Sequence, residues 1–162
     1  LGMMKSRLGG FLRLAGQFPV DRKSGRRALQ ISLALLQEDR VVALFPEGGR
    51  GGGTGDGIKA GVAWLAQHSR APVIPTACLG TRPTGASVGY IPRFRAKLYV
   101  VFGPPIVLPD DLPPGRAGTA RAIEIIEAGL EYHIASAVKQ TGIALPTDTG
   151  VRDDRDIGRT AD

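Results

Sequence analysis

The feature that most constrains the fold is an uninterrupted apolar run, residues 41–45 (Val-Val-Ala-Leu-Phe), which leads into a proline and a loop dense in glycine. Such a run of β-branched and apolar residues is typical of a strand buried on both faces, and we predict a parallel strand over residues 40–45. Because ligands bind at the carboxyl ends of strands in open α/β sheets, chemistry is expected in the loop from Pro46 to Gly57.

Helical and extended patterns alternate along the rest of the chain. Apolar residues at steps of three and four predict helices over residues 1–15, 24–38, 58–68 and 119–140. Apolar stretches predict further strands over residues 73–79 and 97–102, and a short one over 106–108. This alternation favours an α/β domain with a mixed, mostly parallel sheet flanked by helices. We expect the domain to occupy residues 1–145, and residues 146–162 to form a polar, disordered tail.

The chain is poor in cysteine and histidine, which argues against a disulfide and against a metal site. Cys78 is the single cysteine, so no intrachain disulfide forms and a reducing, cytosol-facing setting is expected. Because Cys78 sits in an apolar run, we predict a buried structural thiol. Neither His68 nor His133 has a second ligand residue at the spacing that a metal site needs, so we expect no metal.

The charge of the chain is concentrated near its start. The net charge is +6, and residues 1–30 hold seven basic residues against one acid, Asp21. A basic segment suggests a phosphate, a membrane surface or a nucleic acid as partner. Nucleic acid is not expected, because aromatic residues make up only 6% and no nucleic-acid-binding motif is present. Residues 1–14 fit either a helix lying on an anionic membrane or a core helix with a solvated basic edge.

The glycine-dense loop holds residues suited to anion binding. Glu47 and Arg50 follow the predicted strand, and Gly48 and Gly49 allow a ligand to approach the backbone closely. Arg50 offers a planar fork of donors to a phosphate, and Lys59 lies at the start of the next predicted helix, where N–H groups favour an anion. We therefore predict a phosphate or oxyanion pocket. The structural alternative is an ion pair between Glu47 and Arg50 that ties the loop together.

Two nucleotide-binding patterns fail in this loop. A Walker-type loop needs Gly-Lys followed by Ser or Thr, whereas Lys59 stands between Ile58 and Ala60. Residues 55–60 (Gly-Asp-Gly-Ile-Lys-Ala) fit a loose dinucleotide pattern, but they lie well past the predicted strand and no acid follows at the required spacing. A nucleotide is therefore not the expected ligand.

Four short blocks resemble the PlsC-type acyltransferases, the lysophosphatidate acyltransferase family. Residues 45–50 (Phe-Pro-Glu-Gly-Gly-Arg) are similar to the family signature Phe-Pro-Glu-Gly-Thr-Arg, with Gly49 in place of threonine. The other blocks are residues 16–22 (Gly-Gln-Phe-Pro-Val-Asp-Arg), 59–61 (Lys-Ala-Gly) and 71–75 (Ala-Pro-Val-Ile-Pro). They follow the family's order and spacing, and the resemblance covers about residues 1–110. It implies a glycerolphosphate acyltransferase-like α/β fold.

The resemblance implies an O-acyltransferase of the 1-acylglycerol-3-phosphate type in phospholipid biosynthesis. Such an enzyme transfers a fatty acyl group from acyl-CoA or acyl-carrier protein to a lysophosphatidate-like acceptor, without a further cofactor. By the same resemblance, Arg22 and Arg50, helped by Lys59, hold the acceptor's phosphate, and Glu47 orients its glycerol backbone or braces the arginines. Gly49 lacks the threonine hydroxyl, which bears on substrate preference. The implied location is peripheral, on the cytoplasmic face of the cell membrane.

The family's catalytic dyad is not found in this chain. The family reaction uses His-x-x-x-x-Asp, upstream of the Asp-Arg block, and its histidine removes the proton of the acceptor hydroxyl. Here His68 is followed five positions later by Val73, and His133 by Val138. Because the chain starts at Leu1 and not at methionine, we expect the dyad upstream, and these residues alone to be inactive. The alternative is a non-catalytic phospholipid-binding module of the same fold.

Overall fold

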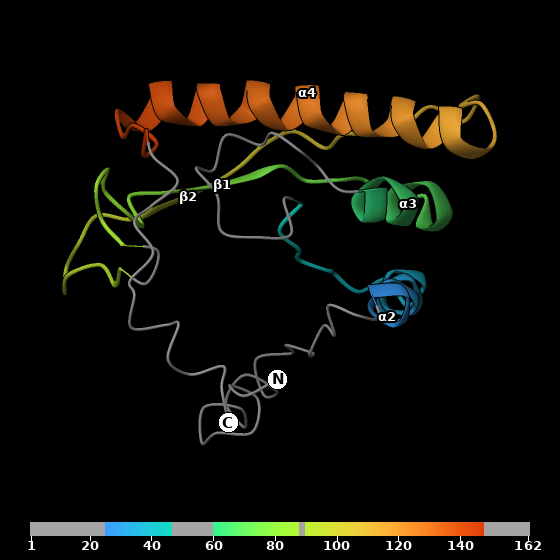
Figure 1. Ribbon diagram of the computed structural model, residues 1–162, viewed down its shortest axis with the longest axis horizontal. Coiled ribbons are helices and arrows are strands. Elements are labelled where there is room, and N and C mark those ends of the chain that lie inside the picture. Colours follow the sequence, from blue (N-terminus) through green and yellow to red (C-terminus); the bar gives the residue numbers. More distant parts are fainter. Residues whose placement is uncertain (1–24, 47–59, 88–89, 148–162) are drawn as a thin grey trace, which may run out of the picture. The chain divides into compact units, whose positions relative to one another are not determined.

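The structure is a computed structural model that describes residues 25–46, 60–87 and 90–147, coloured in Figure 1. Along these residues the elements are α2 (Gly25–Gln37), α3 (Ala60–Ser69), β1 (Thr76–Leu79), β2 (Tyr99–Phe102) and α4 (Gly115–Thr141). The chain divides into two compact units, Leu1–Ala43 and Leu44–Asp162, and each is described by itself. The predicted helix over residues 1–15 and the predicted tail from residue 148 onward lie outside the described residues.

In the first unit, α2 confirms the helix predicted over residues 24–38. Its apolar side chains recur on one side, where Ala28, Leu29 and Leu35 are half-buried and Ser32 is buried. The opposite side begins with the exposed pair Arg26 and Arg27. This amphipathic pattern is the reason why the sequence located the helix correctly.

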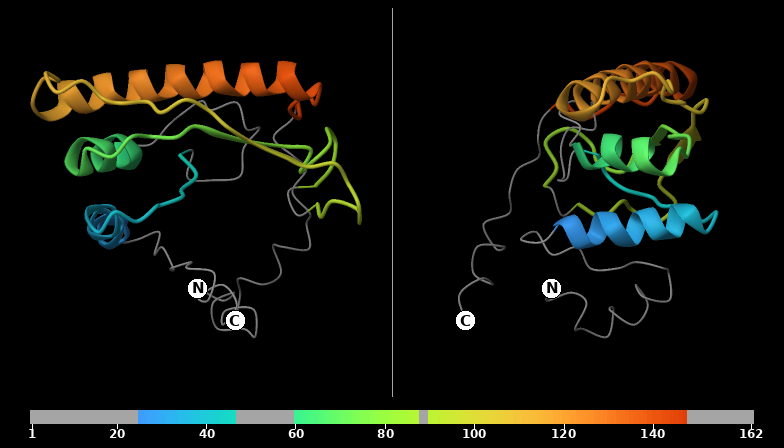
Figure 2. Two further views of the ribbon diagram at one scale, coloured as in Figure 1. Left: turned by 180° about the vertical axis from the view of Figure 1, so that it is seen from behind. Right: turned by 90° about the vertical axis from the view of Figure 1, so that its right-hand side faces the viewer.

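In the second unit, α4 lies along the β1–β2 pair and contacts α3 near its own amino end (Figures 1 and 2). One buried cluster joins α3 to α4, and its members are Val62, Ala63, Ala66, Ala122 and Ile126. A second cluster joins β1 to α4, and its members are Ala77, Leu79, Ile134 and Ala137. None of the described helices combines the length and the apolar composition that crossing a bilayer would require.

The two strands pair in antiparallel fashion, with Thr76 opposite Phe102 and Leu79 opposite Tyr99. An isolated antiparallel bridge between Val73 and Ile106 extends the contact, with N–H···O distances of 2.9 and 2.8 Å. The strands predicted over residues 73–79 and 97–102 are thus present in shortened form, and the one over 106–108 is reduced to this bridge. Because the described pairing is antiparallel, the mostly parallel sheet predicted from the sequence is not found among the described strands.

Residues 40–45 do not form the buried parallel strand that the sequence predicts. Val41 is 94% exposed and Phe45 is 84% exposed, and the segment pairs with neither described strand. A strand requires a partner for its backbone N–H and C=O groups, and an apolar composition does not supply one. The prediction of a buried strand at this position is therefore wrong.

The three described helices share the way in which they end. Each is followed by a residue with positive φ, namely Asp39 (56°), Arg70 (59°) and Gly142 (69°). The N–H of Gly142 donates to the carbonyl of Val138 at 2.9 Å, and the N–H of Arg70 donates to that of Ala66 at 3.1 Å. These bonds satisfy carbonyls that a helix end leaves without partners. Only at Gly142 is this left-handed conformation free of the cost that a side chain adds.

Gly118, in the first turns of α4, lies where the backbone packs too closely for a side chain. A Cβ at this position would collide with the backbone carbonyl oxygen of Pro113. Because a backbone atom cannot swing aside, we expect Gly118→Ala to lower the free energy of unfolding by about 1–3 kcal/mol. Urea titration followed by circular dichroism measures this. Gly25→Ala is the control, because a Cβ there meets nothing within 4 Å, and an unchanged midpoint for Gly118→Ala would contradict the packing.

Cys78 lies on the exposed face of the strand pair, so the prediction of a buried thiol is wrong. Burial alternates along β1, where Ala77 and Leu79 are buried against α4 while Thr76 and Cys78 are exposed. The residue opposite Cys78 in the ladder is Val100, which is exposed as well. The apolar neighbours of Cys78 in sequence therefore point to the other face of the strand.

This register predicts how the thiol reacts. We expect a water-soluble maleimide to label Cys78 in the native chain at nearly the rate seen in the urea-unfolded chain, as judged by mass spectrometry. The matched control is Leu79→Cys in a Cys78→Ser background, because Leu79 is 1% exposed. Its thiol should be strongly protected in the native state, and equal labelling at the two positions would contradict the register.

Candidate functional site

The predicted phosphate pocket lies outside the described residues. Its six residues are Arg22, Glu47, Gly48, Gly49, Arg50 and Lys59. Whether they converge on one anion therefore stays a prediction. The structure describes the residues that flank them, from Gly25 to Pro46 on one side and from Ala60 onward on the other.

The segment that leaves the glycine-dense loop enters a well-packed helix. Helix α3 begins at Ala60, directly after Lys59. Its side chains at Val62, Ala63 and Ala66 are buried against α4. Burial of this kind fixes the helix to the rest of the second unit. Lys59 is thus attached to an element whose position the core determines.

Both histidines are described, and their surroundings differ. His133 is 5% exposed, and its Nε2 donates to the carbonyl of Val101 at 2.9 Å, which ties α4 to β2. The ring packs so closely on Gly103 that a Cβ there would lie 2.5 Å from Nδ1. His68 is exposed, its ring stacks on Trp64 at 4.2 Å, and its Nδ1 donates to the Trp64 carbonyl at 2.8 Å.

Neither histidine has the partner of a general base within the described part of the chain. Each ring nitrogen that makes a hydrogen bond there makes it to a backbone carbonyl, and no described carboxylate orients either ring. A histidine base needs such a group to fix its tautomer and to stabilise its charged form. His133 is therefore a structural residue, and the geometry of His68 gives it no catalytic partner among the described residues.

A cleft of about 820 Å³ lies between the carboxyl end of α3 and the amino end of α4. Arg70 forms an ion pair with Asp110 at its edge, and Thr119 donates a 3.4 Å hydrogen bond to Gln67 across the two helices. Arg116 also lines the cleft. No motif indicated this cleft in the sequence, because its described walls come from two stretches that are far apart in the chain, residues 64–71 and 107–119.

The described residues that line this cleft include none of the site residues predicted from the sequence. The Arg70–Asp110 pair is largely exposed, so it contributes little to stability. Among the described lining residues there is no nucleophile paired with a base, so the cleft offers no catalytic arrangement.

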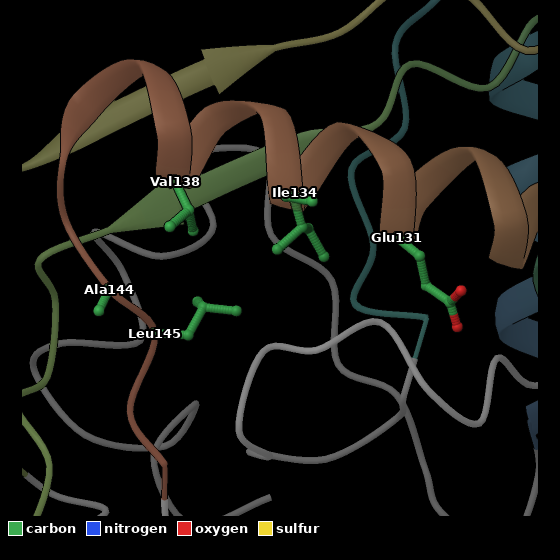
Figure 3. A pocket seen from close by; sticks show the side chains of 6 residues that line it. Glu131, Ile134, Val138, Ala144 and Leu145 are labelled. Carbon is green, nitrogen blue, oxygen red and sulfur yellow. The ribbon is translucent and has the colours of Figure 1, made fainter.

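A shallower hollow of about 430 Å³ lies where the chain folds back beneath the end of α4 (Figure 3). Ile134 and Val138 project from one side of the helix toward Leu145, and Glu131 stands one turn further along. Ile134, Val138 and Leu145 also belong to the apolar cluster around β1. The hollow is thus the edge of the core, and its one carboxylate disfavours an anionic ligand.

Comparisons with known proteins find a matching family model and a relative of this chain. A family model described as Acyltransferase matches residues 2–79. The 1-acyl-sn-glycerol-3-phosphate acyltransferase of Bacillus subtilis (strain 168) is 31% identical over 102 residues, which cover 61% of this chain and 47% of that relative. The match thus spans about half the length of the relative. No solved structure matches the chain. All six residues of the predicted pocket fall within residues 2–79.

The contrast between the two histidines leads to a prediction about stability. Replacing His133 with Phe removes the hydrogen bond to the carbonyl of Val101 and leaves this partly buried oxygen without that donor. We therefore expect a loss of about 1–3 kcal/mol in the free energy of unfolding. His68→Gln, at an exposed position, should change it by no more than about 0.5 kcal/mol. Thermal and urea unfolding measure both variants. A larger loss for His68→Gln than for His133→Phe would contradict the assignment of His133 as the structural residue.

Proposed function

We propose that this chain, which belongs to the acyltransferase family, forms part of a domain that acylates a lysophosphatidate-like acceptor in phospholipid biosynthesis. The observation that carries the proposal is the segment 45–50 (Phe-Pro-Glu-Gly-Gly-Arg), which lies inside the region matched by the family. The name of the Bacillus subtilis relative supports an acceptor that carries one acyl chain and a phosphate. Acyl-CoA or acyl-carrier protein supplies the acyl group.

In this proposal the residues of the chain bind and position the acceptor. Arg22 and Arg50, with Lys59, hold the phosphate through charge-assisted hydrogen bonds, and Glu47 orients the glycerol or braces the arginines. The free hydroxyl then attacks the thioester carbonyl. A C–O bond forms, the C–S bond breaks, and the thiol leaves with the proton that the hydroxyl gave up. Holding the two reactants in this geometry is itself a large part of catalysis.

The acceptor's chemistry leads us to propose a peripheral location on the cytoplasmic face of the cell membrane. A lysophospholipid carries a hydrocarbon chain, and each methylene that is buried in the bilayer contributes about 0.8 kcal/mol. Such a substrate is concentrated in the lipid surface, so an enzyme gains access to it by binding there. The excess of basic residues in this chain favours an anionic surface.

A second candidate function is a phospholipid-binding module without catalysis. It is favoured by the two described histidines, neither of which has a carboxylate partner in the described structure. Both functions require the same phosphate pocket. They differ in whether thiol is released from an acyl thioester.

Acceptor binding tests the pocket that the two functions share. We expect a short-chain lysophosphatidate, kept below its micelle concentration, to bind the chain in a calorimetric titration. Arg50→Gln and Arg22→Gln should each weaken binding by about 10- to 100-fold, because each removes a charge-assisted hydrogen bond. Arg116→Gln is the matched control, since it removes the same charge from the unrelated cleft. If neither Arg22 nor Arg50 affects binding while the folded state is intact, the pocket is wrong.

Thiol release from acyl-CoA then separates catalysis from binding. The 162 residues alone should release no thiol above background, because a missing general base typically costs on the order of 10²–10⁴-fold. The natural protein that contains these residues should release thiol only when lysophosphatidate is added. Binding by that protein without release favours the non-catalytic module.

A further inference from the structure

Residues 90–98, which we name the basic turn, hold apolar side chains in water between basic ones. Phe94 is 94% exposed and Ile91 is 85% exposed. Arg93, Arg95 and Lys97 alternate with them and are exposed as well. A nearly fully exposed phenylalanine contributes almost nothing to the fold, because it buries no surface against the protein. Such a side chain is available for a contact outside the described chain.

The backbone holds these side chains in a defined shape. The N–H of Ala96 donates to the carbonyl of Arg93 at 2.9 Å, which closes a β-turn with Phe94 and Arg95 at its centre. Arg95 has a φ of 67°, as the third residue of a type II turn requires. Pro92 restricts the approach to the turn. Phe94 is therefore presented at the tip of a closed turn.

The basic turn is joined directly to the core of the second unit. It leads into β2 at Tyr99, and β2 pairs with β1, which packs on α4. The connection between the two strands extends beyond their ends, away from the contact between α3 and α4 (Figures 1 and 2). The paired strands thus hold the turn in place. The tip of the turn can contact another surface while the core stays packed.

The charged residues in and near the basic turn are all positive. No acidic residue occurs between Asp56 and Asp110, whereas the basic turn alone carries three bases within five residues, 93–97. Within the described structure none of these three bases forms an ion pair. Basic side chains that surround an apolar tip match the boundary of an anionic bilayer, where phosphates lie above hydrocarbon.

We propose that the basic turn is a membrane-contact element. It inserts Phe94 and Ile91 into the interfacial region of an anionic lipid surface and places Arg93, Arg95 and Lys97 at the lipid phosphates. The inference rests on the proposed function only in that the acceptor is a lipid. A nucleic acid is a poorer match for this turn, because Ile91 has no ring to stack on a base and the apolar tip would stay in water.

Vesicle sedimentation of the full chain measures the contribution of the turn. The chain should bind vesicles of equimolar phosphatidylglycerol and phosphatidylcholine, bind pure phosphatidylcholine weakly, and lose affinity at high salt. Arg93→Gln/Arg95→Gln/Lys97→Gln should reduce partitioning by roughly 100-fold, at about fivefold per basic residue. Phe94→Ser should reduce it by about tenfold without changing the thermal unfolding midpoint.

Helix α4 offers matched controls in both charge and hydrophobicity. Arg116→Gln/Arg121→Gln/Lys139→Gln removes the same three charges from exposed positions on α4. Tyr132→Ser removes an aromatic side chain that is 76% exposed there. Both controls should retain binding within about threefold. If they weaken binding as much as the turn variants, the attraction is a general charge effect and the proposal is wrong.

Insertion has a spectroscopic signature that a purely electrostatic contact lacks. Phe94→Trp should show a blue-shifted emission with anionic vesicles, together with quenching by brominated lipid chains. Tyr132→Trp should show neither change, and the unsubstituted chain, which retains Trp64, gives the background. An unshifted Trp at position 94 would overturn the insertion, as would Phe94-dependent binding to RNA but not to vesicles.

Two further variants separate the contribution of the basic turn from those of residues 1–14 and of the phosphate pocket. Lys5→Gln/Arg7→Gln/Arg13→Gln lowers the background that residues 1–14 contribute, and the effect of Phe94→Ser should persist in that variant. Arg50→Gln should weaken lysophosphatidate binding by about 10- to 100-fold but leave vesicle binding intact. Failure of the pocket alone would refute the proposed function and not the turn, whereas failure of the Phe94 effects alone would refute the turn.

Discussion

Helix α4 is the common partner of the other described elements in the second unit, and the arrangement there depends on its packing. Ala122 and Ile126 meet α3, whereas Ile134 and Ala137 meet β1. Small side chains dominate these contacts, and Ala122 is completely buried. Small residues allow two backbones to approach closely, so even one added methyl group lowers the stability of the fold. A single helix thus organises both a helix–helix and a helix–sheet interface.

This packing bears on function although α4 contributes no residue to the proposed phosphate pocket. It fixes α3, which follows Lys59 without an intervening residue, and it fixes β2, which follows the basic turn. His133 adds a polar tie between α4 and β2 inside this apolar setting. The proposed acceptor pocket and the proposed membrane contact are therefore both continuous in sequence with elements that the same core holds in place.

The two proposals describe different parts of one physical problem. A lysophospholipid has a phosphate that needs cations and a chain that prefers lipid, so its enzyme has to meet both demands. In the first proposal, Arg22, Arg50 and Lys59 meet the first demand with their positive charges. In the second proposal, the basic turn meets the other demand with the exposed apolar side chains of Phe94 and Ile91. Its signal was present in the sequence, as bases alternating with apolar residues over a long stretch without acids, but only exposure shows that the apolar members are unburied.

The sequence by itself located the described helices and predicted the chemistry. Periodicity located α2 and α3 closely and α4 within a few residues at its start, because helical hydrogen bonds join residues four apart and are encoded locally. The segment around Glu47 and Arg50 indicated a resemblance to the acyltransferases without any coordinates, since it is a local pattern of residue types. The same segment's positions in space could not be read from the sequence, and they lie outside the described residues.

Only the tertiary structure decided strand pairing and exposure. Residues 40–45 have the composition of a buried strand and yet lie exposed, and the thiol of Cys78 faces outward from an apolar run. The described strands run antiparallel, against the parallel sheet that the alternation of elements favoured. The physical reason is that a strand's partner, its direction and its buried face depend on residues far away in the chain, so no local pattern can specify them.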